Sequence, residues 1–194
     1  MDKGKRGVVI AGIALVVVLV AAVVGYRMLA PANQGGNSEP GASAAATQEN
    51  TPLLADYDAT VYTGEGEATT LTQIANGRPL VINFWATWCP YCVDEMPELQ
   101  QIAREFGDQV AFAFVDSVDG RREQVQTTQE WLGQNGYDDL PVYYDSDREA
   151  VAAFGARSLP TTVVVGADGK ILSASAGMID PTFMRATLSQ QVRQ

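Results

Sequence analysis

Two short apolar runs with a helical pattern between them constrain the fold of this chain more than any other feature of its sequence. The runs PLVINF (Pro79 to Phe84) and VAFAFV (Val110 to Val115) are rich in β-branched residues and are typical of strands buried on both faces. The apolar residues between them recur at helical spacing: Met96, Leu99, Ile102, Ala103 and Phe106. The pattern predicts a β-α-β unit with parallel strands. Cys89 and Cys92 lie where its helix begins.

The chain after Val115 continues the alternation of helices and strands. Apolar periodicity, capping residues and turn signals predict a helix over Val125 to Leu132, a strand over Pro141 to Tyr144, a helix over Arg148 to Gly155, strands over Thr161 to Val165 and Lys170 to Ala174, and a helix that begins at Asp180-Pro181. A hairpin turn signal, Gly166-Ala167-Asp168-Gly169, separates the last two strands. The sequence therefore predicts an α/β domain with an antiparallel hairpin and a C-terminal helix.

Cys89 and Cys92 are the only cysteines among 194 residues, and the chain has no histidine. A bridge between them would close a loop of four residues, and a disulfide across so short a loop stabilises a fold little. A structural zinc site needs four ligands, which two cysteines without histidine do not complete. Val93 after Cys92 excludes the Cys-x-x-Cys-His pattern of covalent haem attachment. Reversible dithiol chemistry remains.

The N-terminus predicts a membrane anchor. Lys3, Lys5 and Arg6 precede an uncharged apolar run from Gly7 to Gly25, which is long enough for one transmembrane helix. A cleaved signal peptide is the alternative, with Ala30-Pro31-Ala32 as its cleavage site, but its apolar core spans only about 7–15 residues. The positive-inside rule places the N-terminus in the cytoplasm. We therefore expect a single-pass protein of the cell membrane whose remaining residues lie in an oxidising, extracytoplasmic compartment.

Three parts follow from this division of the chain. Residues 1–29 are the cytoplasmic stub and anchor, residues 30–52 form a flexible linker without a large apolar side chain before Pro52, and residues 53–194 form one domain. The formal net charge of −10 argues against nucleic acid as a partner.

Two motifs carry a family resemblance. The segments NFWATWCPYCVDEMPEL and FGARSLPTTVVVGADGKIL, in this order of elements, resemble the thioredoxin fold of the TlpA/ResA-like family of membrane-anchored thiol-disulfide oxidoreductases. The resemblance implies a central mixed β-sheet flanked by helices, no cofactor, protein disulfides or dithiols as substrates, and a membrane thiol carrier that recharges the dithiol. It also implies a setting in cytochrome c maturation and a cis bond before Pro160. Asn83 stands where thioredoxins proper hold a buried acid.

The dithiol residues have distinct expected roles. Cys89 precedes Pro90 at the start of the helix, where unpaired N–H groups and the helix dipole favour its thiolate. Cys89 is therefore the expected nucleophile, and Cys92, one turn further, resolves the mixed disulfide. Trp88, Tyr91, Leu159 and Pro160 are the expected substrate contacts, the last two because a cis-proline leaves a backbone edge free to pair with an extended substrate.

The role of Glu95 and the redox direction stay open between alternatives. Glu95 matches the acidic position of the family pattern, and it either assists proton transfer at the dithiol or is a solvated helix charge. The Pro90-Tyr91 dipeptide resembles glutaredoxin and approaches the DsbA type, which favours an oxidase. The acidic residues Asp94, Glu95 and Glu98, with no basic residue between Trp85 and Gln101, disfavour the thiolate and predict a reductase.

Two further classes compete with a disulfide reductase. A thiol peroxidase would require a lone peroxidatic cysteine, which a Cys-x-x-Cys pair does not supply. A non-catalytic binding module with the same fold would tolerate the loss of one cysteine, whereas both are present.

Overall fold

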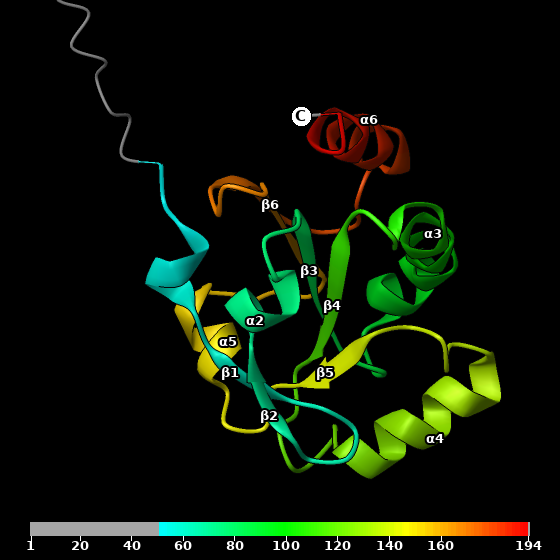
Figure 1. Ribbon diagram of the computed structural model, residues 1–194. Helices are drawn as coiled ribbons and strands as arrows, with labels where there is room; N and C mark the ends of the chain where they lie inside the picture. The colour runs from blue at the N-terminus through cyan, green and yellow to red at the C-terminus, as the bar shows by residue number, and fades with distance from the viewer. Residues whose placement is uncertain (1–50, 194) are drawn as a thin grey trace, which may run out of the picture. The chain divides into compact units, whose positions relative to one another are not determined.

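The computed structural model describes residues 51–193 (Figure 1). The elements follow in the order η1 (Leu54–Tyr57), β1 (Thr60–Tyr62), β2 (Ala68–Thr70), α2 (Leu71–Ala75), β3 (Leu80–Trp85), α3 (Pro90–Phe106), β4 (Ala111–Asp116), α4 (Val125–Asn135), β5 (Val142–Tyr144), α5 (Glu149–Ala153), β6 (Thr161–Val165), β7 (Ile171–Ala176) and α6 (Pro181–Gln191). None of the helices in these residues has both the length and the apolar character to cross a membrane. The predicted anchor and nearly all of the predicted linker lie outside the described residues.

The strands form one mixed sheet in the order β2-β1-β5-β4-β3-β6-β7. Strands β3, β4 and β5 are parallel neighbours, while β6 and β7 join β3 as an antiparallel hairpin. The predicted β-α-β unit is confirmed, because β3 pairs with β4 in parallel from Leu80 opposite Ala111 to Trp85 opposite Asp116. The predicted hairpin after Thr161 is confirmed as well.

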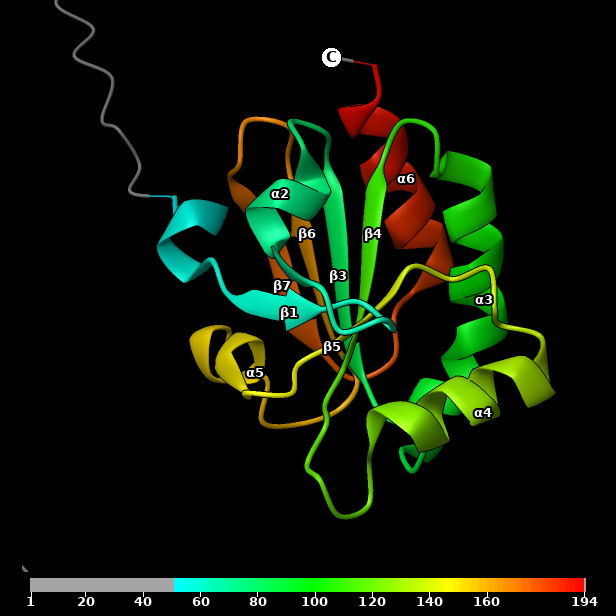
Figure 2. The same ribbon diagram turned by 60° about the horizontal axis from the view of Figure 1, so that its bottom comes forward.

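Helices cover both faces of this sheet (Figure 2). Alternate residues of β3 point to opposite faces, as the pleat of a strand requires. Val81 and Trp85 pack on one face against α3, α4 and α6 through Met96, Leu132 and Leu188. On the other face, residues of β3 and β4 contact η1, α2 and α5. The molecule has the predicted thioredoxin fold, with the start of α3 beside the end of the central strand β3.

The N-terminal elements were not predicted. Strands β1 and β2 have three residues each, and α2 has five, so none is long enough to show a clear period in the sequence. Their positions come from tertiary contacts: Tyr62 of β1 pairs with Tyr144 of β5 at the edge of the sheet. Pro52, assigned from sequence to the linker, already contacts the domain, because its carbonyl accepts a hydrogen bond from the Ile171 amide at 2.9 Å.

Candidate active site

The dithiol lies at the first turn of α3. Cys89 is the N-cap residue and Pro90 occupies the first turn, as the sequence predicts. The Cys89 sulfur accepts a hydrogen bond from the Cys92 backbone amide at 3.2 Å, and the two cysteines form a disulfide. Backbone N–H groups at the start of a helix favour negative charge on a nearby atom. The same geometry therefore favours a thiolate on Cys89 once the disulfide is reduced.

The exposure of the residues around the dithiol separates core from surface. Cys89 and Cys92 are buried, and Trp85 is a core residue with no exposed surface. Trp88 is 41% exposed and Tyr91 is 64% exposed. Exposed aromatic side chains beside a reactive group are suited to contact another protein. Trp88 and Tyr91 thus lie where a substrate approaching Cys89 would meet them.

The segment before β6 supplies the opposite wall of the site. The Leu159–Pro160 peptide bond is cis, as the resemblance implies. Thr161, the next residue, pairs with Phe84, so Pro160 lies level with Trp85 at the end of β3. Leu159 is half-buried and packs against the core cluster that contains Cys89 and Cys92. The structure brings the four expected substrate contacts to the end of the sheet that carries the dithiol.

Glu95 is buried on the inner face of α3 with 3% exposure, so it is not a solvated helix charge. Its Oε1 accepts a hydrogen bond from Asn83 Nδ2 at 2.9 Å, and its Oε2 accepts one from the Ile179 amide at 3.0 Å. Burial raises the pKa of Glu95, and the two hydrogen bonds oppose this effect. Glu95 therefore holds its proton to higher pH than a surface glutamate, one turn after Cys92.

The charges near the dithiol are more balanced than the local sequence indicates. The Arg122 guanidinium lies 3.9 Å from the centre of the Trp88 ring, although 33 positions separate Arg122 from Cys89 in the printed sequence. Glu98 is paired with Arg185 at 2.6 Å. Of the three acidic residues that were expected to disfavour the thiolate, Glu95 is the buried one. The sequence pattern contained no signal for Arg122, because it reaches the site through the loop after β4.

Sequence analysis also missed two buried carboxyl groups next to the loop that precedes Cys89. Asp116 ends β4 and Glu123 lies on the following loop, and neither has exposed surface. Neither residue belongs to a motif or to a periodic pattern in the sequence. The chain offered one indirect signal, an acidic residue directly after a fully apolar strand.

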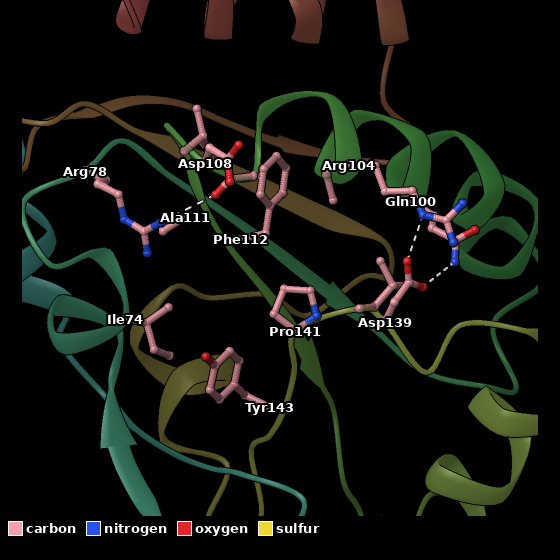
Figure 3. A pocket seen from close by; sticks show the side chains of 14 residues that line it. Ile74, Arg78, Gln100, Arg104, Asp108, Ala111, Phe112, Asp139, Pro141 and Tyr143 are labelled. Atoms are coloured by element: carbon pink, nitrogen blue, oxygen red, sulfur yellow. Dashed lines mark hydrogen bonds and ion pairs between the residues drawn. The ribbon is translucent and has the colours of Figure 1, made fainter.

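A cavity of about 450 Å³ lies at the opposite end of the sheet (Figure 3). It is bounded by the C-terminal turns of α3 and the first residues of β4. Figure 3 shows Gln100 and Arg104 turned toward Asp139, to which they are hydrogen-bonded at 2.6 and 2.7 Å. Because Cys89 precedes the first turn of α3, this cavity is separate from the dithiol site.

Comparison with known proteins places the chain in a family. The family model described as the AhpC/TSA family matches residues 44–174. The chain is 31% identical over 114 residues to the thiol-disulfide oxidoreductase ResA of Halalkalibacterium halodurans, covering 58% of this chain and 61% of that protein. It is 36% identical over 113 residues to the thiol:disulfide interchange protein DsbE of Allochromatium vinosum, covering 57% and 59%. The match thus spans about three fifths of the length of each relative.

A solved structure shows the same fold. The exposed lipoprotein thioredoxin Etrx1 of Streptococcus pneumoniae is 27% identical, with a TM-score of 0.60 over 69% of this chain and 98% of Etrx1. The predicted TlpA/ResA-like resemblance agrees with these relatives. The chain belongs to the AhpC/TSA family, with ResA- and DsbE-type thioredoxin-fold proteins among its relatives.

Proposed function

We propose that this protein is a membrane-tethered thiol-disulfide oxidoreductase that reduces protein disulfides outside the cytoplasm. The observation that carries the proposal is the placement of the Cys89 sulfur at the N-cap of α3, within hydrogen-bond distance of the Cys92 amide. The cis peptide bond at Pro160 and the exposed Trp88 and Tyr91 support a protein substrate at this site. Relatives named thiol-disulfide oxidoreductase support the same reaction class.

The reaction needs no atoms beyond the two cysteines and the substrate. The Cys89 thiolate attacks one sulfur of the substrate disulfide, which forms a mixed disulfide and releases the other substrate sulfur as a thiolate. The released substrate thiolate takes up the proton of Cys92, and the Cys92 thiolate attacks the Cys89 sulfur, which restores the Cys89–Cys92 disulfide and releases the second substrate thiolate. Two electrons pass from the protein to its substrate, and a membrane thiol carrier would return them.

The reducing direction is favoured by Glu95, the buried acidic residue of α3. A strong oxidant has a stabilised reduced form, which requires a thiolate with a low pKa. Glu95 is buried one turn after Cys92, and a carboxylate there opposes a second negative charge. The expected potential lies nearer the about −270 mV of thioredoxin than the about −120 mV of DsbA. The alternative, a DsbA-like oxidase, rests on the Pro90-Tyr91 dipeptide and predicts a potential above about −150 mV.

Insulin reduction by the full chain tests the reaction. We expect the wild-type protein to reduce insulin with dithiothreitol as the electron source, and both Cys89→Ser and Cys92→Ser to lose turnover. The Cys92→Ser variant should accumulate a mixed disulfide through Cys89, whereas Cys89→Ser should not. Equal turnover by wild type and Cys89→Ser would instead favour a non-catalytic binding module.

The tether is part of the proposal and rests on the apolar run from Gly7 to Gly25. Cell fractionation followed by N-terminal sequencing tests it: the chain should remain in the membrane fraction with its first residues attached. A soluble form that begins near Asn33 would support cleavage.

The resemblance further supports a role in cytochrome c maturation. A deletion strain should therefore lose covalently bound haem. The wild-type protein should restore it, and the Cys89→Ser variant should not.

A further inference from the structure

Two carboxyl groups that are buried behind the dithiol loop have no role in the proposed reaction. Asp116 ends β4 and pairs in register with Trp85 at the end of β3, and Glu123 lies on the loop that follows β4. Both side chains are fully buried. Carboxyl groups are rarely buried without a partner, because desolvation disfavours their charged form. A buried pair of like groups beside a reactive loop therefore calls for a function.

Glu123 holds the loop that leads into Cys89. Its Oε1 accepts a hydrogen bond from the Thr87 amide and its Oε2 accepts one from the Thr87 hydroxyl, both at 2.7 Å. Thr87 lies two residues before Cys89. The neighbouring Arg122 lies over the Trp88 ring, so two consecutive residues contact two consecutive positions of the loop. Glu123 thereby fixes both the backbone and the side chain of Thr87.

Thr128 of α4 connects the two carboxyl groups. Its hydroxyl lies 2.8 Å from Asp116 Oδ2 and 3.2 Å from Glu123 Oε1. Burial and, second to it, the negative charge of Glu123 together raise the pKa of Asp116 to about 8, while the hydrogen bond from Thr128 opposes this rise. Asp116 therefore keeps its proton at neutral pH.

The other titratable and charged groups that face Asp116 and Glu123 do not lower the pKa of Asp116. Asp119 on the same loop is a carboxylate at neutral pH, because hydrogen bonds from the Glu123 and Arg121 amides lower its pKa to about 2, and its charge raises the pKa of Asp116. Tyr144 of β5 is neutral, since burial raises its pKa to about 12. Arg122 forms an ion pair with Asp119, in which Arg122 Nε lies 3.6 Å from Asp119 Oδ2.

We propose that Asp116 and Glu123 are positioning residues that share one proton and hold Thr87, and through it the loop that presents Cys89. The inference rests on the proposed thiol-disulfide exchange at Cys89. While Asp116 is protonated, Glu123 receives the two hydrogen bonds of Thr87 without a second buried charge beside it. When Asp116 loses its proton, two adjacent carboxylates repel each other in a poorly solvated site, and the hold on Thr87 weakens.

The first test follows Thr87 directly in the oxidised full chain, where the cysteines do not titrate. Selective ¹⁵N-threonine labelling in detergent micelles reports the Thr87 amide, whose resonance should shift with a midpoint near pH 8. The Asp116→Asn variant, whose amide can still donate to Glu123, should abolish this titration. Asp139→Asn is the matched control at the far end of the sheet and should keep it. A Thr87 resonance that does not titrate between about pH 6 and 10, or an unchanged midpoint in Asp116→Asn, would overturn the proposal.

A second variant keeps the test decisive if Asp116→Asn does not fold. Thr128→Val removes the hydroxyl that lowers the pKa of Asp116 and preserves the shape of the side chain. The midpoint of the pH titration of the Thr87 amide resonance should then move to higher pH. A midpoint that stays in place or moves down would contradict the shared proton.

Positioning is tested by the reactivity of the reduced protein. The rate constant for alkylation of Cys89, corrected for the fraction of thiolate, should fall several-fold in wild type above pH 8 and stay level in Asp116→Asn. Thr87→Ser, which keeps both hydrogen bonds to Glu123, should behave as wild type, and Thr87→Val should show the lower rate at neutral pH. Equal corrected rates in all variants would refute the positioning role.

Failure of insulin reduction with an intact Thr87 titration would count against the proposed function and leave the shared proton standing.

Discussion

Individual side chains around the dithiol have properties that their neighbours in the sequence do not determine. Glu95 is the example: its helical spacing from Cys92 allowed either a buried or a solvated carboxyl. The packing of the segment before α6 decided between them, because the Ile179 amide reaches Glu95 across 84 positions of the chain. Asn83 is positioned by β3, two residues before the end of the strand. The result is a buried carboxyl group held by two elements.

The charge of Glu95 should control the Cys89 thiol. We expect Glu95→Gln to lower the pKa of Cys89 and to raise the reduction potential, because removal of a nearby carboxylate favours the thiolate. Asn83 can accommodate the new amide by turning its own side-chain amide over, which presents its oxygen to Gln. The ultraviolet absorbance of the thiolate and equilibration with glutathione measure the two quantities.

Glu98→Gln is the control for this comparison. Glu98 lies on the same helix but is already paired with Arg185, so its replacement should change the thiol pKa much less. Shifts of equal size in both variants would show that the general acidity of α3, and not Glu95, sets the thiol pKa.

At the scale of elements, the starts of α3 and α6 were predictable from sequence, whereas the short strands β1 and β2 were not. Cys89-Pro90 and Asp180-Pro181 each combine an N-cap residue with a proline that suits the first turn, and both helices begin as predicted. Capping is local, so a few residues suffice to indicate it. The hairpin of β1 and β2 depends on its pairing with β5, which no local pattern records.

The start of α3 should make the two cysteines differ in reactivity. In the reduced protein near neutral pH, we expect iodoacetamide to modify Cys89 and to spare Cys92, because Cys89 caps the helix and Cys92 lies inside it with 1% exposure. Peptide mass spectrometry after brief alkylation identifies the modified residue. Faster modification of Cys92 would reverse the assigned roles.

The cap of α6 should contribute measurably to stability. Asp180 accepts hydrogen bonds from the amides of Thr182 and Phe183 at 2.8 and 3.1 Å. Asp180→Ala should lower the free energy of unfolding by about 1 kcal/mol, whereas Asp180→Asn, which retains a capping oxygen, should lower it much less. Urea denaturation of the two variants makes the comparison. The same loss in both would mean that the cap is not the source of the effect.

At the scale of the whole molecule, sequence identified the fold class, the dithiol and the cis-proline, and it missed the polar groups that long-range contacts bring to the site. The fold class and the dithiol rest on periodicity and on residues adjacent in sequence, whereas the cis-proline rests on the family resemblance. Arg122 and Glu123 were missed because the loop after β4 carries no periodic pattern, and Asp116 was missed because it follows the apolar run at the end of that strand. Its position beside the dithiol loop becomes evident once β3 and β4 are aligned in parallel.

The proton held by Asp116 should also affect the free energy of unfolding of the whole domain. The pKa of Asp116 is about 8 in the folded state against 3.8 for an unperturbed aspartate, so the folded state binds this proton more tightly than the unfolded state. The resulting stabilisation is fully present below pH 3.8 and is lost as the pH rises through about 8. The free energy of unfolding should therefore fall as the pH rises toward about 8 and level off above that value.

Asp116→Asn should remove most of that fall, because asparagine has no proton to lose. Urea denaturation at several pH values measures the effect. Asp139→Asn is the control: its ion pair with Arg104 lowers the pKa of Asp139, so this group stays charged throughout the range. A parallel pH dependence in wild type and Asp116→Asn would assign the loss of stability to other groups.

The contact of Pro52 with Ile171 fixes where the described chain enters the domain. Ile171 is level with Val165, and Val165 with Leu80, so the described chain joins the domain beside the first residue of β3. The dithiol follows the last residue of that strand, at the opposite pole of the sheet. Any pull on the chain upstream of Pro52 therefore acts on the pole away from Cys89. A tether attached at that pole would leave Cys89 at the end of the domain away from the point of attachment.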